Sequence, residues 1–224
     1  MFFSCSINHF KKFLYVVVYF GFSVAFAGSY EDFFKAIRQD DERTVTTLLQ
    51  RGFDPNTLDS SGQHGLMLAV REPSPKVAKV LITWPKMNVE VRNANDESPL
   101  MLAALAGDME LCGLLIQNNA DVNKPGWAPL HYAATKGHVV VMNLLLDENA
   151  YIDAGSPNGT TPLMMAAYYG TPSAVKLLLE AGADPLLKNM QGLTALDFAD
   201  RGNREDSAQI IRAFVRARQP KGTW

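Results

Sequence analysis

Histidine is the residue type in this chain best suited to acid–base or metal chemistry. Residues 28–224 contain three histidines, which are His64, His131 and His138. None of them has a Cys, Asp or Glu partner at the spacing of a metal site such as H-E-x-x-H or C-x-x-C. The sequence therefore predicts no metal site.

Nucleophilic and phosphate chemistry also lack their usual motifs. There is no G-x-S-x-G turn, no P-loop lysine and no glycine-rich loop between a strand and a helix. Cys112 lies in the apolar run of residues 111–116, so we expect a buried thiol that does not react. We predict a protein that is not an enzyme and needs no cofactor. The alternative is an enzyme built on the groove of the fold described below.

The composition limits the class of partner. The 224 residues are 47% hydrophobic and 20% charged, which is typical of one globular domain. The net charge is −2, and residues 28–224 carry 19 basic and 23 acidic side chains. This balance argues against nucleic-acid binding, which normally needs a basic surface. The one basic cluster, at Arg212, Arg216, Arg218 and Lys221, suits the C-terminal end of a helix.

The N-terminus has the pattern of a cleavable signal peptide over residues 1–27. Lys11 and Lys12 precede the apolar run 13–27, which ends in Ala25-Phe26-Ala27. A membrane-spanning helix needs about 20 apolar residues, and this run has 15. We expect a periplasmic or secreted protein that has no membrane segment after cleavage. The alternative is an uncleaved anchor.

A repeated pattern determines the predicted fold. Pro99, Pro129 and Pro162 stand 30 and 33 residues apart, and a further 33 lead to Ala195. Most of these residues follow a helix-capping hydroxyl, at Ser98, Thr161 and Thr194. An alanine pair and a glycine come next (Gly107, Gly137 and Gly170), and we expect each glycine to end its helix with positive φ. A leucine-rich second helix then ends at Asn119, Asn149 or Gly182.

This pattern resembles the ankyrin repeat, which has a period of about 33 residues. The resemblance implies an all-α solenoid of about six helix-turn-helix repeats with β-turn fingers. We place the ankyrin-repeat domain at residues 28–216, after the signal peptide and before a tail at 217–224. The repeats lie near residues 30–58, 59–92, 93–123, 124–154, 155–187 and 188–216. Residues 84–88 are irregular, and the finger between Asn123 and Ala128 is about three residues short.

The resemblance also implies a function, which is protein binding on a concave face made by the finger tips and the exposed edges of the first helices. The histidines then have structural roles, with His131 bonding the backbone of the neighbouring loop. The implied partner-binding residues are Glu97, Leu105, Trp127, Lys136, Thr160, Tyr168, Tyr169, Leu193 and Arg201. Large apolar side chains at exposed positions indicate an interaction surface. The alternative is that Trp127 and Tyr168 only pack against their neighbours.

We therefore expect an exported, monomeric module that binds a protein of unknown identity. An accessory or protective role for a periplasmic enzyme fits this prediction. The alternative function is a secreted effector or inhibitor that binds a host or competitor protein.

Overall fold

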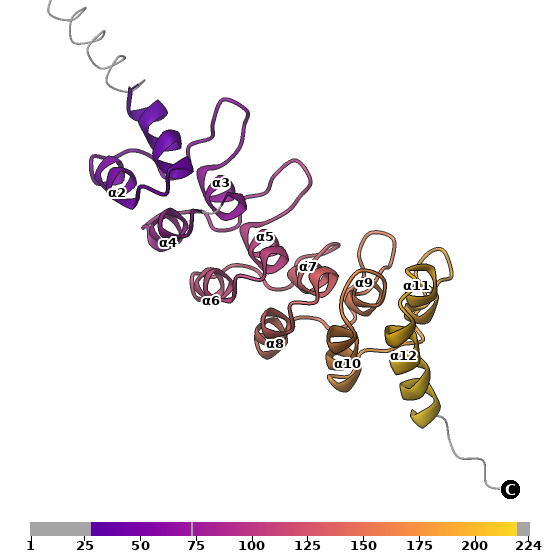
Figure 1. Ribbon diagram of the computed structural model, residues 1–224. Helices are drawn as coiled ribbons and strands as arrows, with labels where there is room; N and C mark the ends of the chain where they lie inside the picture. Colours follow the sequence, from indigo (N-terminus) through magenta and orange to yellow (C-terminus); the bar gives the residue numbers. More distant parts are fainter. Residues whose placement is uncertain (1–27, 73, 219–224) are drawn as a thin grey trace, which may run out of the picture. The chain divides into compact units, whose positions relative to one another are not determined.

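The computed structural model describes residues 28–72 and 74–218, and this part of the chain is built from helices (Figure 1). A helix over residues 28–38 comes first. The helices that follow are α2 (Glu42–Gln50), α3 (Gly65–Arg71), α4 (Pro75–Thr83), α5 (Pro99–Ala106), α6 (Met109–Gln117), α7 (Pro129–Lys136), α8 (Val139–Asp147), α9 (Pro162–Tyr168), α10 (Pro172–Glu180), α11 (Ala195–Arg201) and α12 (Glu205–Arg218). The all-α repeat fold is confirmed. The predicted signal peptide lies outside the described residues.

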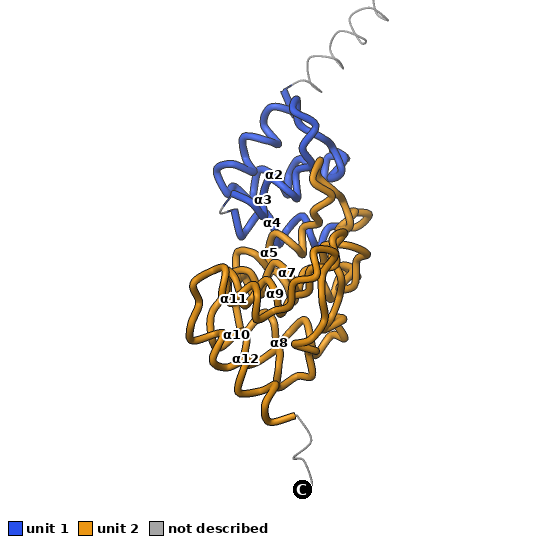
Figure 2. The backbone as a smooth tube through the Cα atoms, turned by 90° about the vertical axis from the view of Figure 1, so that its right-hand side faces the viewer, with its two compact units in different colours: residues 1–84 blue, residues 85–224 orange. Residues whose placement is uncertain are grey.

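The chain divides into two compact units, which are coloured separately in Figure 2. Unit 1 covers residues 1–84 and unit 2 covers residues 85–224. The division falls at the irregular stretch 84–88, where Trp84 ends α4 with an extended backbone. The repeat boundaries within residues 28–216 stay predictions.

Unit 1 has its own apolar core. Phe33 and Ile37 are fully buried, and the ring centroid of Phe33 lies 4.6 Å from that of Phe53. His64 caps α3, because its Nδ1 accepts the backbone N–H of Leu66 at 3.1 Å. The sequence pattern places a capping residue at this position, and the structure shows histidine in that role.

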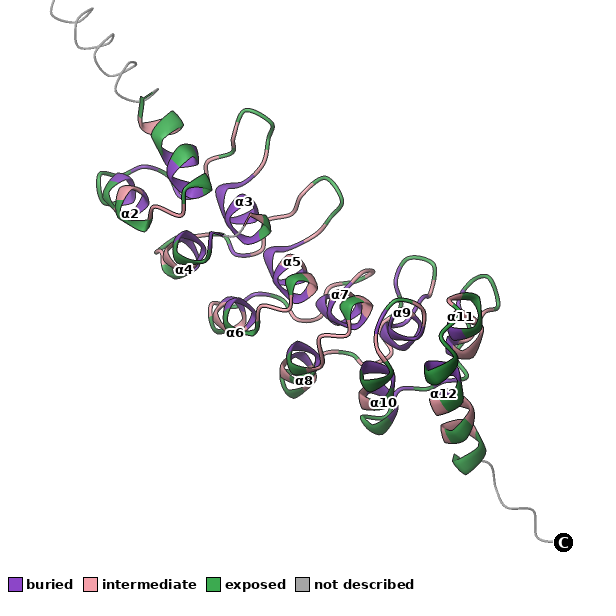
Figure 3. Ribbon diagram, viewed as in Figure 1, coloured by how far each residue is buried: buried purple, intermediate pink, exposed green. Residues whose placement is uncertain are grey.

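Unit 2 contains four consecutive helix pairs in its described part. The first helices of the pairs, α5, α7, α9 and α11, pack side by side, and so do the second helices, α6, α8, α10 and α12. The alanine pairs of α5, α7 and α9 are fully buried, which keeps these helices thin enough to stack closely. Figure 3 shows how the buried residues follow this line of first helices.

The predicted helix starts are confirmed. The hydroxyl oxygen of Ser98 accepts the N–H of Met101 at 3.2 Å. Thr161 and Thr194 cap α9 and α11 in the same way. The capping side chain satisfies a backbone donor that the first helical turn leaves free.

Most of the predicted helix ends are also confirmed. Gly107 and Gly137 have φ values of 75° and 71°. The second helices end with positive φ at Asn119 (68°), Asn149 (64°) and Gly182 (109°). These are residues that tolerate the left-handed conformation at low cost.

Gly170 is different, and the expectation of positive φ there is wrong. The helix α9 already ends at Tyr168, and Arg204 of the next helix pair bonds the free carbonyls of Tyr168, Tyr169 and Gly170. A Cβ atom at position 170 would overlap the carbonyl oxygen of Ala134 on α7. The close approach of two helices therefore requires glycine here, not a left-handed turn.

Candidate partner-binding surface

The ends of the first helices are fixed by hydrogen bonds from the following pair. His138 Nε2 lies 3.1 Å from the carbonyl oxygen of Leu105 at the end of α5. Arg204 Nη2 lies 2.7 Å from the carbonyl oxygens of both Tyr169 and Gly170. Both donors come from the same position of the repeat. They hold the exposed ends of α5 and α9 in place.

His131 joins one finger to the next, as the resemblance implies. Its Nδ1 accepts the N–H of Ala128 at 3.1 Å, and its Nε2 lies 3.0 Å from the carbonyl oxygen of Thr160. Burial lowers the pKa of His131, so the ring is neutral at pH 7. The side chain has a structural role.

The fingers of unit 2 differ in length. Backbone hydrogen bonds close three of them, from Asn93 N to Glu97 O, from Ser156 N to Thr160 O and from Asn189 N to Leu193 O. The short finger instead turns at Gly126, where φ is 81°. Trp127 follows this turn and lies edge-on to the His131 ring, with 5.2 Å between centroids.

A row of large side chains runs across the first helices at one position of the repeat. Leu102, Tyr132, Met165 and Phe198 stand 30, 33 and 33 residues apart, and each is partly buried. We call these four residues the inner row. They lie between the helix-start motif and the alanine pair, and they are not among the predicted partner-binding residues. Their regular spacing was the signal that could have found them.

The predicted residues at the helix ends extend this row. Leu105, Tyr168 and Arg201 follow the inner row by three residues, and Lys136 and Tyr169 follow it by four, so they share its helix face. The Tyr168 ring lies 6.2 Å from the Phe198 ring and 4.4 Å from the Tyr169 ring, between centroids. We call the inner row together with these five residues the inner surface.

The inner surface is accessible mainly at the helix ends. Tyr169 is 55% exposed, and Lys136 and Arg201 are also exposed. Tyr168 and Leu105 are partly buried. Of the predicted finger residues, Glu97, Trp127 and Leu193 are partly buried.

Thr160 does not belong to an accessible surface, and its prediction as a contact residue is wrong. It is 2% exposed. Its N–H donates to Ser156 Oγ at 3.0 Å, while its carbonyl faces His131. The finger needs this residue for its own hydrogen bonds.

Glu97 is engaged within unit 2. Its Oε1 accepts the Tyr132 hydroxyl at 2.9 Å, and its Oε2 accepts from Asn93 Nδ2 at 2.6 Å. Burial, together with the hydrogen bond to Glu97, raises the pKa of Tyr132. The carboxylate therefore fastens the finger to α7.

Several apolar side chains on the loops are more exposed than Tyr169 of the inner surface. Met190 is 79% exposed, Tyr151 is 69% exposed and Leu186 is 63% exposed. They are not among the predicted partner-binding residues, which include only the last residue of a finger. Met190 itself lies in the finger of residues 189–193.

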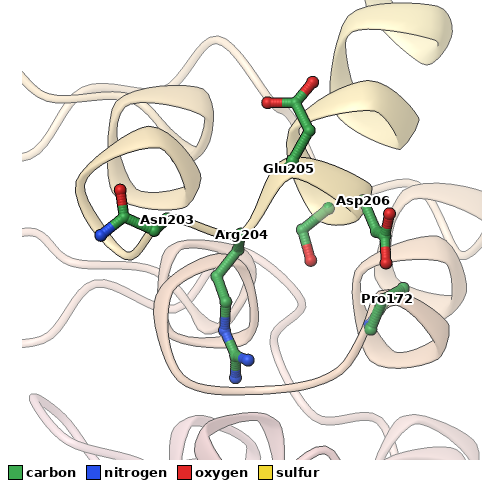
Figure 4. Close-up of a pocket in the computed structure, with 6 residues that line it drawn as sticks. Pro172, Asn203, Arg204, Glu205 and Asp206 are labelled. Carbon is green, nitrogen blue, oxygen red and sulfur yellow. The ribbon is translucent and has the colours of Figure 1, made fainter.

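A depression of about 280 Å³ lies at the start of α12 (Figure 4). It is lined by Pro172, Asn203, Arg204, Glu205, Asp206 and Ser207. Figure 4 shows the Arg204 and Glu205 side chains pointing to opposite sides. Arg204 is bonded to the end of α9, and Glu205 pairs with Arg212 at 3.2 Å. Arg204 and Glu205 of this depression thus already have partners within unit 2.

Residues 28–72 and 74–218 contain no group of three His, Cys, Asp or Glu side chains placed to hold a metal ion. Within these ranges, no helix combines the length and apolar character that crossing a membrane requires.

The chain matches the family model for ankyrin repeats (three copies) over residues 33–125, 66–156, 100–189 and 141–215. The putative ankyrin repeat protein YahD of Escherichia coli strain K12 is 28% identical, over 81% of this chain and 94% of that protein. The p105 subunit of nuclear factor NF-kappa-B from Gallus gallus is 33% identical, over 66% of this chain. The match spans 16% of the p105 length.

Two solved structures are similar over most of this chain. One is a chain in the complex of the Bd0816 predatory endopeptidase from Bdellovibrio bacteriovorus with the immunity protein Bd3460. It has a TM-score of 0.71 and 29% identity, and the match covers 81% of this chain and 97% of that chain. The other is an ankyrin repeat domain from Acinetobacter baumannii AYE, with a TM-score of 0.71 and 25% identity over 81% of this chain and 96% of that chain.

Proposed function

Because the chain belongs to the ankyrin-repeat family, we propose that it is an exported module that binds a partner protein on its inner surface. The observation that carries this proposal is the inner row, in which four consecutive first helices present a large side chain that is not fully buried. Such a continuous set suits association with another protein. The ankyrin fold offers a binding surface, and the proposal includes no catalytic step.

The aromatic pair is the expected centre of the surface. Tyr168 and Tyr169 project from the end of α9, and that end is held by Arg204. A fixed aromatic group loses little conformational entropy when a partner covers it. Truncation of a hot-spot tyrosine costs about 2 kcal/mol or more, which corresponds to an affinity about thirtyfold weaker.

Site-specific photocrosslinking in the native host tests this proposal. A photoreactive phenylalanine analogue replaces Tyr169 in the full chain, and a control chain carries it at Val140, which is 59% exposed on α8. We expect a discrete adduct with one protein from position 169 and none from position 140. Adducts from position 140 alone, or from neither position, would contradict the proposal.

The solved complex favours a second, more specific function, in which the partner is a peptidase that this chain inhibits. The complex named above contains an endopeptidase and its immunity protein, and the similar chain matches this one over 97% of its length. An inhibitor of this kind would protect the cell that makes the peptidase. Inhibition of such a peptidase would combine the protective role and the inhibitor role that are expected from the sequence.

Titration distinguishes the two functions. The protein found in the Tyr169 adduct is purified and assayed on a casein substrate with increasing amounts of the full chain. An inhibitor predicts a linear loss of activity that ends at one chain per peptidase. A partner without peptidase activity, or with activity unchanged at saturation, would exclude inhibition and leave the binding function in place.

Export is part of the proposal and rests on the pattern of residues 1–27. We expect the chain purified from the host to begin at Gly28 and to occur in the periplasm or the medium. Fractionation with mass spectrometry of the N-terminal peptide measures both. A chain that keeps Lys11 and Lys12 and remains in the cytoplasm would contradict export.

A further inference from the structure

The helix ends on the inner surface carry two cations beside the aromatic pair. Lys136 is the last residue of α7, and Arg201 is the last residue of α11. Tyr168 and Tyr169 end the helix between them, α9. Lys136 and Arg201 are exposed, and neither makes an ion pair within the described residues.

The acidic groups of the same region are already engaged. The Asp200 carboxylate accepts from Arg212 Nη2 at 2.6 Å. Asp197 accepts from the Thr194 N–H and hydroxyl, each at 2.7 Å. The Glu97 carboxylate accepts from Tyr132 and Asn93. These bonds hold the carboxylates in place without removing the charges of Asp197 and Glu97, and Asp197 also interacts electrostatically with Arg201. The two charged side chains of the inner surface itself, Lys136 and Arg201, are both exposed cations.

The distance between α7 and α11 determines how long a bound segment of a partner must be to reach both Lys136 and Arg201. Packed helices lie about 8–10 Å apart, so α7 and α11 are separated by about 20 Å with α9 between them. An extended chain covers about 3.3 Å per residue. About six residues therefore span the distance from Lys136 to Arg201.

We propose that the inner surface binds an extended acidic segment of its protein partner. Apolar side chains in the middle of the segment contact Tyr168, Tyr169 and Phe198, and carboxylates at its two ends pair with Lys136 and Arg201. Charge-assisted hydrogen bonds between arginine and carboxylate are stronger than neutral ones and fix the register of the segment. This inference rests on the proposed function and specifies the chemistry of its partner.

Three synthetic peptides test the proposal by fluorescence anisotropy with the full chain. Their sequences are GEESFLSEEG, GQQSFLSQQG and GKKSFLSKKG, so only the charge at the two ends differs. We expect the acidic peptide to bind at least tenfold more tightly than the neutral one and the basic peptide to bind least. Its affinity should fall as salt rises, because salt screens exposed charges. Equal binding of all three peptides, tighter binding of the basic one, or no binding would overturn the proposal.

Charge reversal supplies the matched control. The double variant Lys136→Glu/Arg201→Glu should reverse the order and prefer the basic peptide. The variant Arg216→Glu, in the exposed last turn of α12, should keep the wild-type order. Circular dichroism verifies that both variants are folded. An unchanged order in the double variant would contradict the assignment of the two cations. An adduct at Tyr169 in the crosslinking experiment would still support the proposed function.

Discussion

Two glycines of unit 2 differ in what an added methyl group would meet. A Cβ atom at Gly170 would overlap the carbonyl oxygen of Ala134 and come within 2.9 Å of Ala166 Cα. At Gly113, inside α6, a Cβ atom would have no neighbour within 4 Å. We expect Gly170→Ala to lower the free energy of unfolding by about 1–3 kcal/mol. Gly113→Ala should raise it by about 0.5–1 kcal/mol, because alanine favours the helix. Urea denaturation measures both, and equal effects would contradict this account of Gly170.

The buried side chain of His64 makes the stability of the folded chain depend on pH. Burial lowers its pKa from 6.5 to about 4, opposed by the nearby charge of Asp54. The unfolded chain therefore binds the proton more readily than the folded chain between pH 6.5 and 4. Protonation of His64 therefore leaves the free energy of unfolding unchanged above pH 6.5 and lowers it by about 3 kcal/mol as the pH drops to 4.

The variant His64→Thr isolates this effect, because threonine keeps a cap acceptor that does not titrate. We expect the stability difference between wild type and variant to change by about 3 kcal/mol between pH 7 and pH 4. The measurement is the free energy of unfolding in urea at both pH values. Parallel pH profiles would show that His64 is not the group responsible.

At the level of single residues, the sequence predicts the framework better than the surface. Ser98, Thr161 and Thr194 were identified as caps because their role depends only on local backbone geometry. Thr160 is predicted on the surface because it precedes the cap of α9, whereas the structure buries it through hydrogen bonds with Ser156 of its own finger and with His131 of α7.

At the scale of the helix, the C-terminal end of α9 is capped by Arg204 of the next helix pair and not by a residue of its own pair. Its guanidinium bonds three carbonyls at the end of α9. We expect Arg204→Ala to weaken hydrogen-exchange protection in α9 and in the start of α12 by about 1 kcal/mol. Arg216→Ala, in the exposed last turn of α12, should leave these amides unchanged. Equal losses in the two variants would show that the Arg204 contacts do not stabilise α9.

The helix scale also explains why the inner row was missed. The period of the motif, with its capping residues, predicts where each helix begins. Which side of a first helix stays accessible depends on how the neighbouring first helices pack against it, and a single repeat does not contain that information. Phe198 and Met165 occupy positions that look like core positions in the sequence, yet both are only partly buried.

At the scale of the whole molecule, each unit has its own core. Leu81 is fully buried in unit 1, and Leu145 is fully buried in unit 2. Truncation of a buried leucine costs about 2–5 kcal/mol, and the stability of a repeat protein is largely local. We expect Leu81→Ala to reduce hydrogen-exchange protection mainly within residues 28–84, and Leu145→Ala mainly within residues 85–218. Equal losses across both ranges in each variant would show a single cooperative unit.

The affinity of the crosslinked partner for two variants tests the central claim most directly. Tyr168→Ala removes an aromatic ring from the inner surface, and Val140→Ala shortens a 59% exposed side chain on α8, outside it. We predict that Tyr168→Ala weakens binding about thirtyfold and that Val140→Ala changes it less than about twofold. A full loss with Val140→Ala and unchanged binding with Tyr168→Ala would place the interface on the second helices and contradict the account.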